Sequence, residues 1–179
     1  MQRPEDRLEQ LGMPIAELSA GYTELGTSQA KFVSHRRLGN VLYLSGTVPL
    51  RDGRPYLPGV VGQDLTLEQG YEAARWALRS GLVVAKYALT ELDRVEHIMQ
   101  MTGYVNSAPG FHDQPRVING ATDLLVDLYG DRGFAARAAI GCQGLGLGSS
   151  VEIVLSLVFS GDSVREPRQT AAARATGRS

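Results

Sequence analysis

Two apolar runs near the end of the chain, residues 134–140 and 151–159, constrain the fold most strongly. They read Phe-Ala-Ala-Arg-Ala-Ala-Ile and Val-Glu-Ile-Val-Leu-Ser-Leu-Val-Phe, and a glycine-rich turn joins them. Such runs predict strands, yet each contains one charged residue, Arg137 or Glu152. A charge buried without a partner costs several kcal/mol. We therefore expect the two residues to form a mutual ion pair, to bind a ligand or to belong to a catalytic site.

The first half of the chain predicts a β-hairpin. Residues 32–33 and 41–44 are apolar, and Gly39 and Asn40 between them suit a turn at positive φ. The second strand ends at Ser45 and Gly46, where a glycine lets a ligand approach the main chain closely. Residues 51–63 contain too many glycines and prolines for a regular element, so we expect a loop there.

Two helices and a further strand follow. Thr66 and Gln69 have the spacing of a capping box, which predicts a helix that runs to about Tyr87. Residues 95–105 alternate as in a strand. Asp113 is placed to cap a second helix, which is expected to present one apolar stripe: Val117, Ile118, Ala121, Leu124, Leu125 and Leu128.

The resulting order, ββαβαββ, predicts an α+β fold in which two helices cover one face of a mixed sheet. The other face has no element to cover it. Because residues 151–159 are apolar on both faces of their strand, we expect the open face to be buried against another copy of the chain in a closed homo-oligomer.

Composition excludes several classes of function. A chain of 179 residues with 43% hydrophobic residues favours one globular domain. A net charge of −1 and a pI near 6.3 argue against a nucleic-acid partner. The single cysteine, Cys142, fits a reducing cytoplasmic setting, and no apolar run is long enough to span a membrane. His35, His97 and His112 lack a metal-ligand spacing and are predicted to be surface or interface residues.

Several motifs together resemble the reactive intermediate deaminase family, also called the YjgF family. The most specific are Phe-Ala-Ala-Arg at 134–137 and Val-Glu-Ile at 151–153, which place the arginine and the glutamate fifteen residues apart. Tyr-Leu-Ser-Gly at 43–46 and Ile-Asn-Gly-Ala at 118–121 add to the match. The resemblance covers roughly residues 31–160. It leaves residues 1–30 as an N-terminal extension and 161–179 as a disordered, mildly basic tail, with a helix as the alternative for the tail.

The resemblance implies a chorismate-mutase-like fold and a homotrimer. In this family the three sheets pack into a central barrel, and a cleft lies at each subunit interface. The implied activity is hydrolysis of enamines and imines such as 2-aminoacrylate to a 2-keto acid and ammonia. No metal or organic cofactor is implied.

The same resemblance assigns roles to single residues. Arg137 matches the arginine that clamps the substrate carboxylate, a task that suits its planar guanidinium. Glu152 matches the acid that holds the attacking water and exchanges protons with the leaving amine. Ser45 and Gly46 match a polar rim, and Asn119 matches an amide at the cleft. A helix cap or interface amide for Asn119, and an ordinary strand role for Ser45, remain open alternatives.

Two departures from the family pattern concern the same cleft. Phe32 stands where the archetype has a tyrosine, and Ala139 stands where the family commonly has a cysteine. Cys142 is therefore expected to be either a buried apolar residue or a reactive thiol outside the usual position. These departures keep two further hypotheses open, a non-enzymatic binder of 2-keto acids or other metabolites and a specialised biosynthetic enzyme. Ribonuclease activity is disfavoured by the acidic pI.

Overall fold

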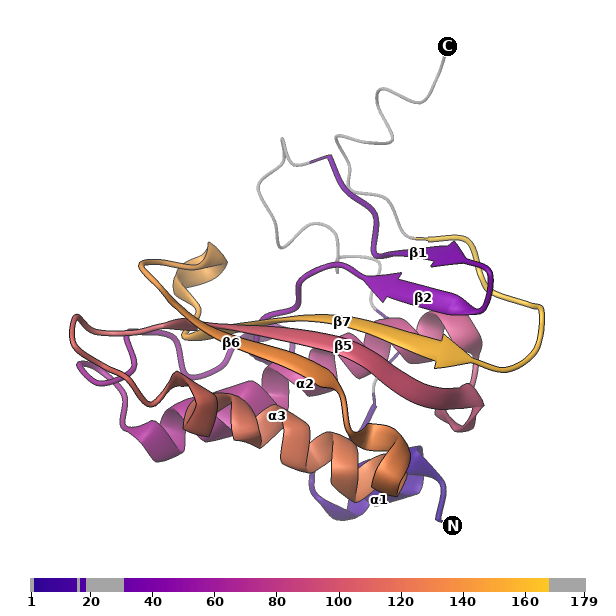
Figure 1. The fold of residues 1–179 in the computed structure, drawn as a ribbon, viewed down its shortest axis with the longest axis horizontal. Coiled ribbons are helices and arrows are strands. Elements are labelled where there is room, and N and C mark those ends of the chain that lie inside the picture. The colour runs from indigo at the N-terminus through magenta and orange to yellow at the C-terminus, as the bar shows by residue number, and fades with distance from the viewer. Residues whose placement is uncertain (1, 16, 19–30, 168–179) are drawn as a thin grey trace.

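A computed structural model describes residues 2–15, 17–18 and 31–167 (Figure 1). The chain forms one five-stranded sheet with α2 and α3 packed side by side against one of its faces. The helices and strands, in chain order, are α1 (Pro4–Gln10), β1 (His35–Leu38), β2 (Val41–Leu44), β3 (Leu50–Arg51), β4 (Arg54–Pro55), α2 (Leu67–Leu89), β5 (Val95–Asn106), α3 (Gln114–Tyr129), β6 (Ala136–Cys142) and β7 (Val151–Phe159).

The strand order in the sheet is β1-β2-β7-β5-β6, which leaves β6 at one edge and β1 at the other. β5 and β6 run parallel, whereas the other neighbouring strands are antiparallel. The predicted α+β fold with a mixed sheet and two helices on one face is therefore confirmed. The apolar runs at 134–140 and 151–159 form β6 and β7, and these two strands are not neighbours because β5 lies between them.

Alternation along β7 separates the two faces of the sheet. Its odd-numbered residues, from Val151 to Phe159, are buried against the helices, and its even-numbered residues face the uncovered side. On the uncovered side Tyr43, Ile140 and Val154 remain substantially exposed. Within the described part of the chain, no helix is long and apolar enough to cross a membrane.

Two predictions concern the residues at which α2 and α3 begin. Thr66 accepts from the backbone N–H of Gln69, and the Gln69 side chain accepts from the N–H of Thr66, so the predicted capping box is confirmed. Asp113 is the N-cap residue of α3, as predicted, but its side chain makes no capping hydrogen bond. Instead Gln114 folds back and donates to the carbonyl of Phe111 at 2.7 Å.

Three other predictions differ from the structure. The first strand of the hairpin is β1, so it begins at His35 rather than at residues 32–33. Residues 51–63, predicted to be loop, include part of the two-residue strands β3 and β4. The N-terminal segment is more than a surface appendage, because Leu8 and Met13 are buried in the main core.

The described part of the predicted tail, residues 161–167, contacts the end of α2. The N–H of Arg165 donates to the carbonyl of Ala88 at 2.9 Å, and the hydroxyl of Tyr87 donates to the carbonyl of Glu166 at 3.1 Å. This segment therefore has backbone partners in the fold. The rest of the predicted tail and residues 19–30 of the predicted extension lie outside the described residues.

Candidate active site

Arg137 lies on the edge strand β6 and faces α3. Its Cα is in register with that of Met101, whose side chain is fully buried between the sheet and the helices. Residues paired in register on neighbouring strands point to the same face of the sheet. The Nη1 of Arg137 accordingly donates to Asn119 Oδ1 at 2.7 Å and to Thr122 Oγ1 at 3.2 Å. Two side chains one turn apart on α3 thus hold one nitrogen of the guanidinium.

The other edge of the Arg137 guanidinium is available to a ligand. Among the described residues, Nε and Nη2 have no hydrogen-bond partner, and the side chain forms no ion pair. The residue is exposed. A guanidinium edge with two parallel N–H groups binds a carboxylate through two hydrogen bonds. Arg137 is therefore oriented by α3 and left with the edge that suits a carboxylate.

Glu152 lies on β7 and faces the opposite, uncovered side of the sheet. Its neighbours Val151 and Ile153 point into the core, and its Cα is in register with that of Tyr104 on β5. The carboxylate fills the space that a side chain at Gly46 would need. A Cβ added at Gly46 would lie 1.9 Å from Glu152 Oε1. The predicted close approach at Gly46 is therefore made by this glutamate.

The surroundings of Glu152 disfavour its charged form. Burial raises the pKa of the Glu152 carboxyl above its ordinary value. Burial, and then the negative charge of Glu152, raise the pKa of the Cys142 thiol. The thiolate is the reactive form of cysteine, so a raised pKa argues against a reactive thiol at Cys142. Cys142 was predicted to be either a buried apolar residue or a reactive thiol, and for this half-buried side chain the apolar role fits better.

Arg137 and Glu152 do not pair with each other within one chain. They point to opposite faces of the sheet, and β5 separates their strands. The mutual ion pair that the sequence left open is therefore absent in the single chain. Arg137 is exposed and hydrogen-bonded to α3, whereas Glu152 is half-buried beside Gly46.

The remaining predicted site residues fall into two groups. Asn119 contacts Arg137 directly, which favours a role at the cleft over a helix cap. Ala139 is half-buried two residues along β6 from Arg137, on the same face. Ser45 directly follows β2 and Phe32 lies shortly before β1, so both belong to the edge of the sheet opposite β6. The Ser45 hydroxyl donates to the carbonyl of Val33 at 2.5 Å, and Phe32 is 38% exposed.

His35 is buried, which makes its predicted surface or interface position wrong. Only 2% of the residue is exposed. Its Nδ1 lies 3.0 Å from Ser34 Oγ, and its Nε2 lies 3.0 Å from the carbonyl oxygen of Arg165. Burial lowers the pKa of the imidazole, so the neutral form is favoured. His35 thus fastens β1 to the segment that follows β7.

Thr122 is the functional residue that the sequence did not single out. Its hydroxyl accepts from Arg137 and has the carbonyls of Ile118 and Asn119 within 3.5 and 3.2 Å. Its position three residues after Asn119, on the same face of a helix, was a signal that could have found it. No group of three or more histidine, cysteine, aspartate or glutamate side chains in the described residues could hold a metal ion.

The candidate site therefore has two parts on an α+β sheet. α3 holds an arginine on the edge strand β6, and a half-buried glutamate lies on the other face of the sheet. The profile of a family described as "YjgF/chorismate mutase-like, putative endoribonuclease" matches residues 5–158. The chain belongs to this family.

The chain is also similar to individual proteins. Protein TCP17 of Trypanosoma cruzi is 33% identical over 147 residues, which cover 82% of this chain and 88% of the relative. The crystal structure of the Agrobacterium tumefaciens protein Atu1372, described as of unknown function, has a TM-score of 0.78 at 32% identity and covers 88% of this chain and 92% of that one. A Shewanella oneidensis protein that carries the same endoribonuclease description has a TM-score of 0.79 at 26% identity and covers 88% and 100%.

Proposed function

We propose that this protein hydrolyses small carboxylated imines and enamines of the 2-aminoacrylate type to 2-keto acids and ammonia. The observation that carries the proposal is the guanidinium of Arg137. Asn119 and Thr122 hold its Nη1, and its Nε and Nη2 remain available for a substrate carboxylate. Orientation of this kind provides much of the catalysis that an easy hydrolysis requires.

The reaction needs a water molecule and a route for protons. An enamine first takes a proton at carbon and becomes the imine. Water then adds to the imine carbon, and the resulting amino alcohol expels ammonia as the carbonyl forms. Glu152 is the residue proposed to hold the water, accept its proton and return a proton to the leaving nitrogen. Its pKa, raised by burial, supports this exchange, because a carboxyl with a pKa closer to neutrality both gives and takes protons.

The proposed site is completed by a second copy of the chain. Arg137 and Glu152 lie on opposite faces of one sheet, so one copy offers a carboxylate clamp without an acid beside it. The uncovered face that carries Glu152 also carries exposed Tyr43, Ile140 and Val154. We infer that this face packs against other copies in a homotrimer and brings the glutamate of one copy to the arginine of the next. Light scattering combined with size-exclusion chromatography measures the number of copies.

The decisive experiment generates 2-aminoacrylate freshly with a pyridoxal-phosphate-dependent dehydratase and follows the release of pyruvate. The intact protein is expected to accelerate release over the spontaneous rate, and Arg137→Ala is expected to abolish the acceleration. Arg54→Ala is the matched control, because Arg54 is an exposed arginine on β4 far along the chain from both site strands. Absence of acceleration by the intact, correctly assembled protein would refute the proposal.

A second candidate is a non-enzymatic binder of 2-keto acids. Ala139 in place of the thiol that the family commonly carries favours it, since this position adjoins Arg137 on β6. Saturable binding of pyruvate or a longer 2-keto acid, lost in Arg137→Ala and accompanied by no turnover of any imine, would support this candidate. The endoribonuclease description of the relatives is tested in the same series with a labelled RNA. The net charge of −1 predicts no cleavage.

A further inference from the structure

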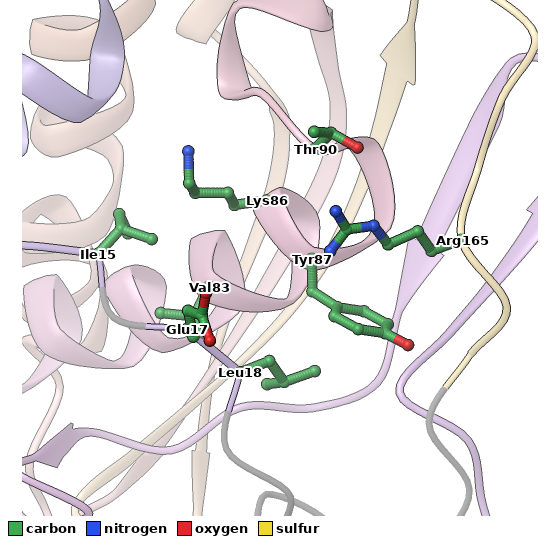
Figure 2. Close-up of a pocket in the computed structure, with 8 residues that line it drawn as sticks. All are labelled: Ile15, Glu17, Leu18, Val83, Lys86, Tyr87, Thr90 and Arg165. Atoms are coloured by element: carbon green, nitrogen blue, oxygen red, sulfur yellow. The ribbon is translucent and has the colours of Figure 1, made fainter.

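A cavity lies near the β1 edge of the sheet, away from Arg137 of the same chain. Its volume is about 260 Å³, and it is enclosed by the last turns of α2, the N-terminal segment and the segment after β7 (Figure 2). Tyr87, one of its lining residues, contacts the ring of His35 on β1. Because β1 and β6 are the opposite edges of the sheet, this cavity is distant from Arg137 of the same chain.

The cavity has an apolar floor and a polar rim. Leu18 and Val83 are buried, whereas Glu17, Thr90 and Arg165 are exposed. Small-molecule sites typically combine apolar walls with a few polar groups that fix the orientation of the ligand. The volume is below the usual range for a drug-sized ligand, so a metabolite of a few carbon atoms fits better.

Arg165 is anchored by its backbone and leaves its guanidinium free. Its N–H donates to the carbonyl of Ala88, and its own carbonyl oxygen lies 3.0 Å from His35 Nε2. The guanidinium lies 5.7 Å from the centre of the Tyr87 ring and, among the described residues, makes no hydrogen bond or ion pair. Figure 2 shows it between Tyr87 and Thr90. The cation is thus held in place with its N–H groups available.

Thr90 adds a hydroxyl at a strained backbone position. Its φ of 75° and ψ of −42° are unusual for a β-branched residue and cost roughly 1–3 kcal/mol. Strain of this kind occurs preferentially at ligand sites. The carbonyls at the end of α2 already have donors, among them Thr90 N–H for Lys86 and Arg94 Nη1 for Leu89. These donors reduce the repulsion that a helix C-terminus exerts on an anion.

Glu17 supplies a charge of the opposite sign at the rim of the cavity. The other cation that lines the cavity, Lys86, forms an ion pair with Glu5 at 3.0 Å. Among the described residues, neither Arg165 nor Glu17 forms an ion pair, with each other or with another side chain. Both Glu17 and Arg165 line the cavity, and Figure 2 shows them apart from each other. Two separated opposite charges above an apolar floor match a zwitterion.

We propose that this cavity binds a free α-amino acid with an apolar side chain. The carboxylate lies against the Arg165 guanidinium and the Thr90 hydroxyl, the ammonium faces Glu17, and the side chain covers Leu18 and Val83. Exposed charges are screened by water and salt, so the expected dissociation constant is on the order of 1 mM. The proposal does not depend on the imine hydrolysis proposed above.

The test is calorimetric or NMR titration of the full chain with L-leucine, with 4-methyl-2-oxopentanoate, which lacks the ammonium, and with isopentylamine, which lacks the carboxylate. Leucine is expected to bind saturably, and each analogue at least about fivefold more weakly. Arg165→Gln and Glu17→Gln are expected to weaken leucine binding by about tenfold and fivefold, respectively. These exposed positions are suited to substitution without loss of fold, which circular dichroism checks.

Two control variants separate this site from others. Arg54→Gln makes the same charge change at an exposed position outside the cavity and is expected to leave leucine binding unchanged. Arg137→Ala removes the proposed catalytic clamp and is also expected to leave it unchanged. Absence of saturation at about 10 mM leucine, or equal binding by wild type and Arg165→Gln, overturns the proposal whatever the outcome of the imine assay.

Discussion

Removing the Asn119 side chain tests whether α3 orients the arginine that is proposed to bind substrate. In Asn119→Ala, Arg137 Nη1 loses an acceptor at 2.7 Å and keeps Thr122 Oγ1 at 3.2 Å. We expect KM for 2-aminoacrylate to rise with kcat less affected, since the carboxylate is bound in the ground state and the transition state alike.

The magnitude follows from the kind of hydrogen bond that is lost. Hydrogen bonds to charged groups contribute roughly 1.5–3 kcal/mol, and the exposure of Arg137 together with the remaining acceptor reduces this to about 1 kcal/mol. About 1 kcal/mol corresponds to a fivefold rise in KM. Asn119→Ala combined with Thr122→Val removes both acceptors and is expected to cost about 2 kcal/mol, a rise of roughly thirtyfold.

The assay is steady-state pyruvate release over a range of aminoacrylate-generating rates, with unfolding by urea as a parallel check on stability. Thr122→Ser retains the hydroxyl and is the matched control, with kinetics close to wild type. Asn119→Asp keeps an acceptor but adds a negative charge that competes with the substrate, so its KM is expected to rise as well. Unchanged kcat/KM in the double variant refutes the idea that these side chains orient Arg137.

Four other substitutions probe the fold and the glutamate. Gly46→Ala places a methyl group 1.9 Å from Glu152 Oε1 without a positive-φ penalty, so kcat should fall by roughly 10- to 100-fold while Tm changes little. Gly120→Ala brings a Cβ to 2.0 Å from the carbonyl oxygen of Tyr71 on α2 and should lower the free energy of unfolding by about 1–3 kcal/mol, whereas Gly146→Ala, with nothing within 4 Å, should not. Tyr129→Phe removes a buried hydroxyl that has no hydrogen-bond partner among the described residues, and it should leave urea stability equal or higher by about 1 kcal/mol; a clear loss would contradict this. Glu152→Gln tests the raised pKa. The folded chain holds this proton more tightly than the unfolded chain, so wild-type stability falls as pH rises from the ordinary value of 4.5 through the raised pKa. The variant should therefore gain Tm over wild type at about pH 8 and not at about pH 4, and an equal difference at both would contradict the assignment.

Local patterns in the sequence predicted most of the secondary structure. The apolar run of β7, the capping box at Thr66 and the apolar stripe of α3 depend on neighbours within a few residues, and the elements that they predicted are confirmed. The predicted hairpin start was wrong, and Asp113 takes the predicted N-cap position without the side-chain hydrogen bond, because the ends of elements are less well specified by local patterns than their type. His35 was misjudged since its partner, Arg165, is distant in the chain.

The sequence by itself also singled out Arg137 and Glu152, because charges in apolar runs are poorly explained by packing, and Gly46, because a glycine permits close approach to the main chain. Asn119 was added only by the family resemblance. The sequence could not decide which of them meet. Strand order and register are set by pairing between distant segments, and one residue of register moves every side chain to the other face. Only the tertiary structure therefore decided that Asn119 holds Arg137, that Gly46 meets Glu152 on the opposite face, and that Arg165 lines a cavity together with the N-terminal segment.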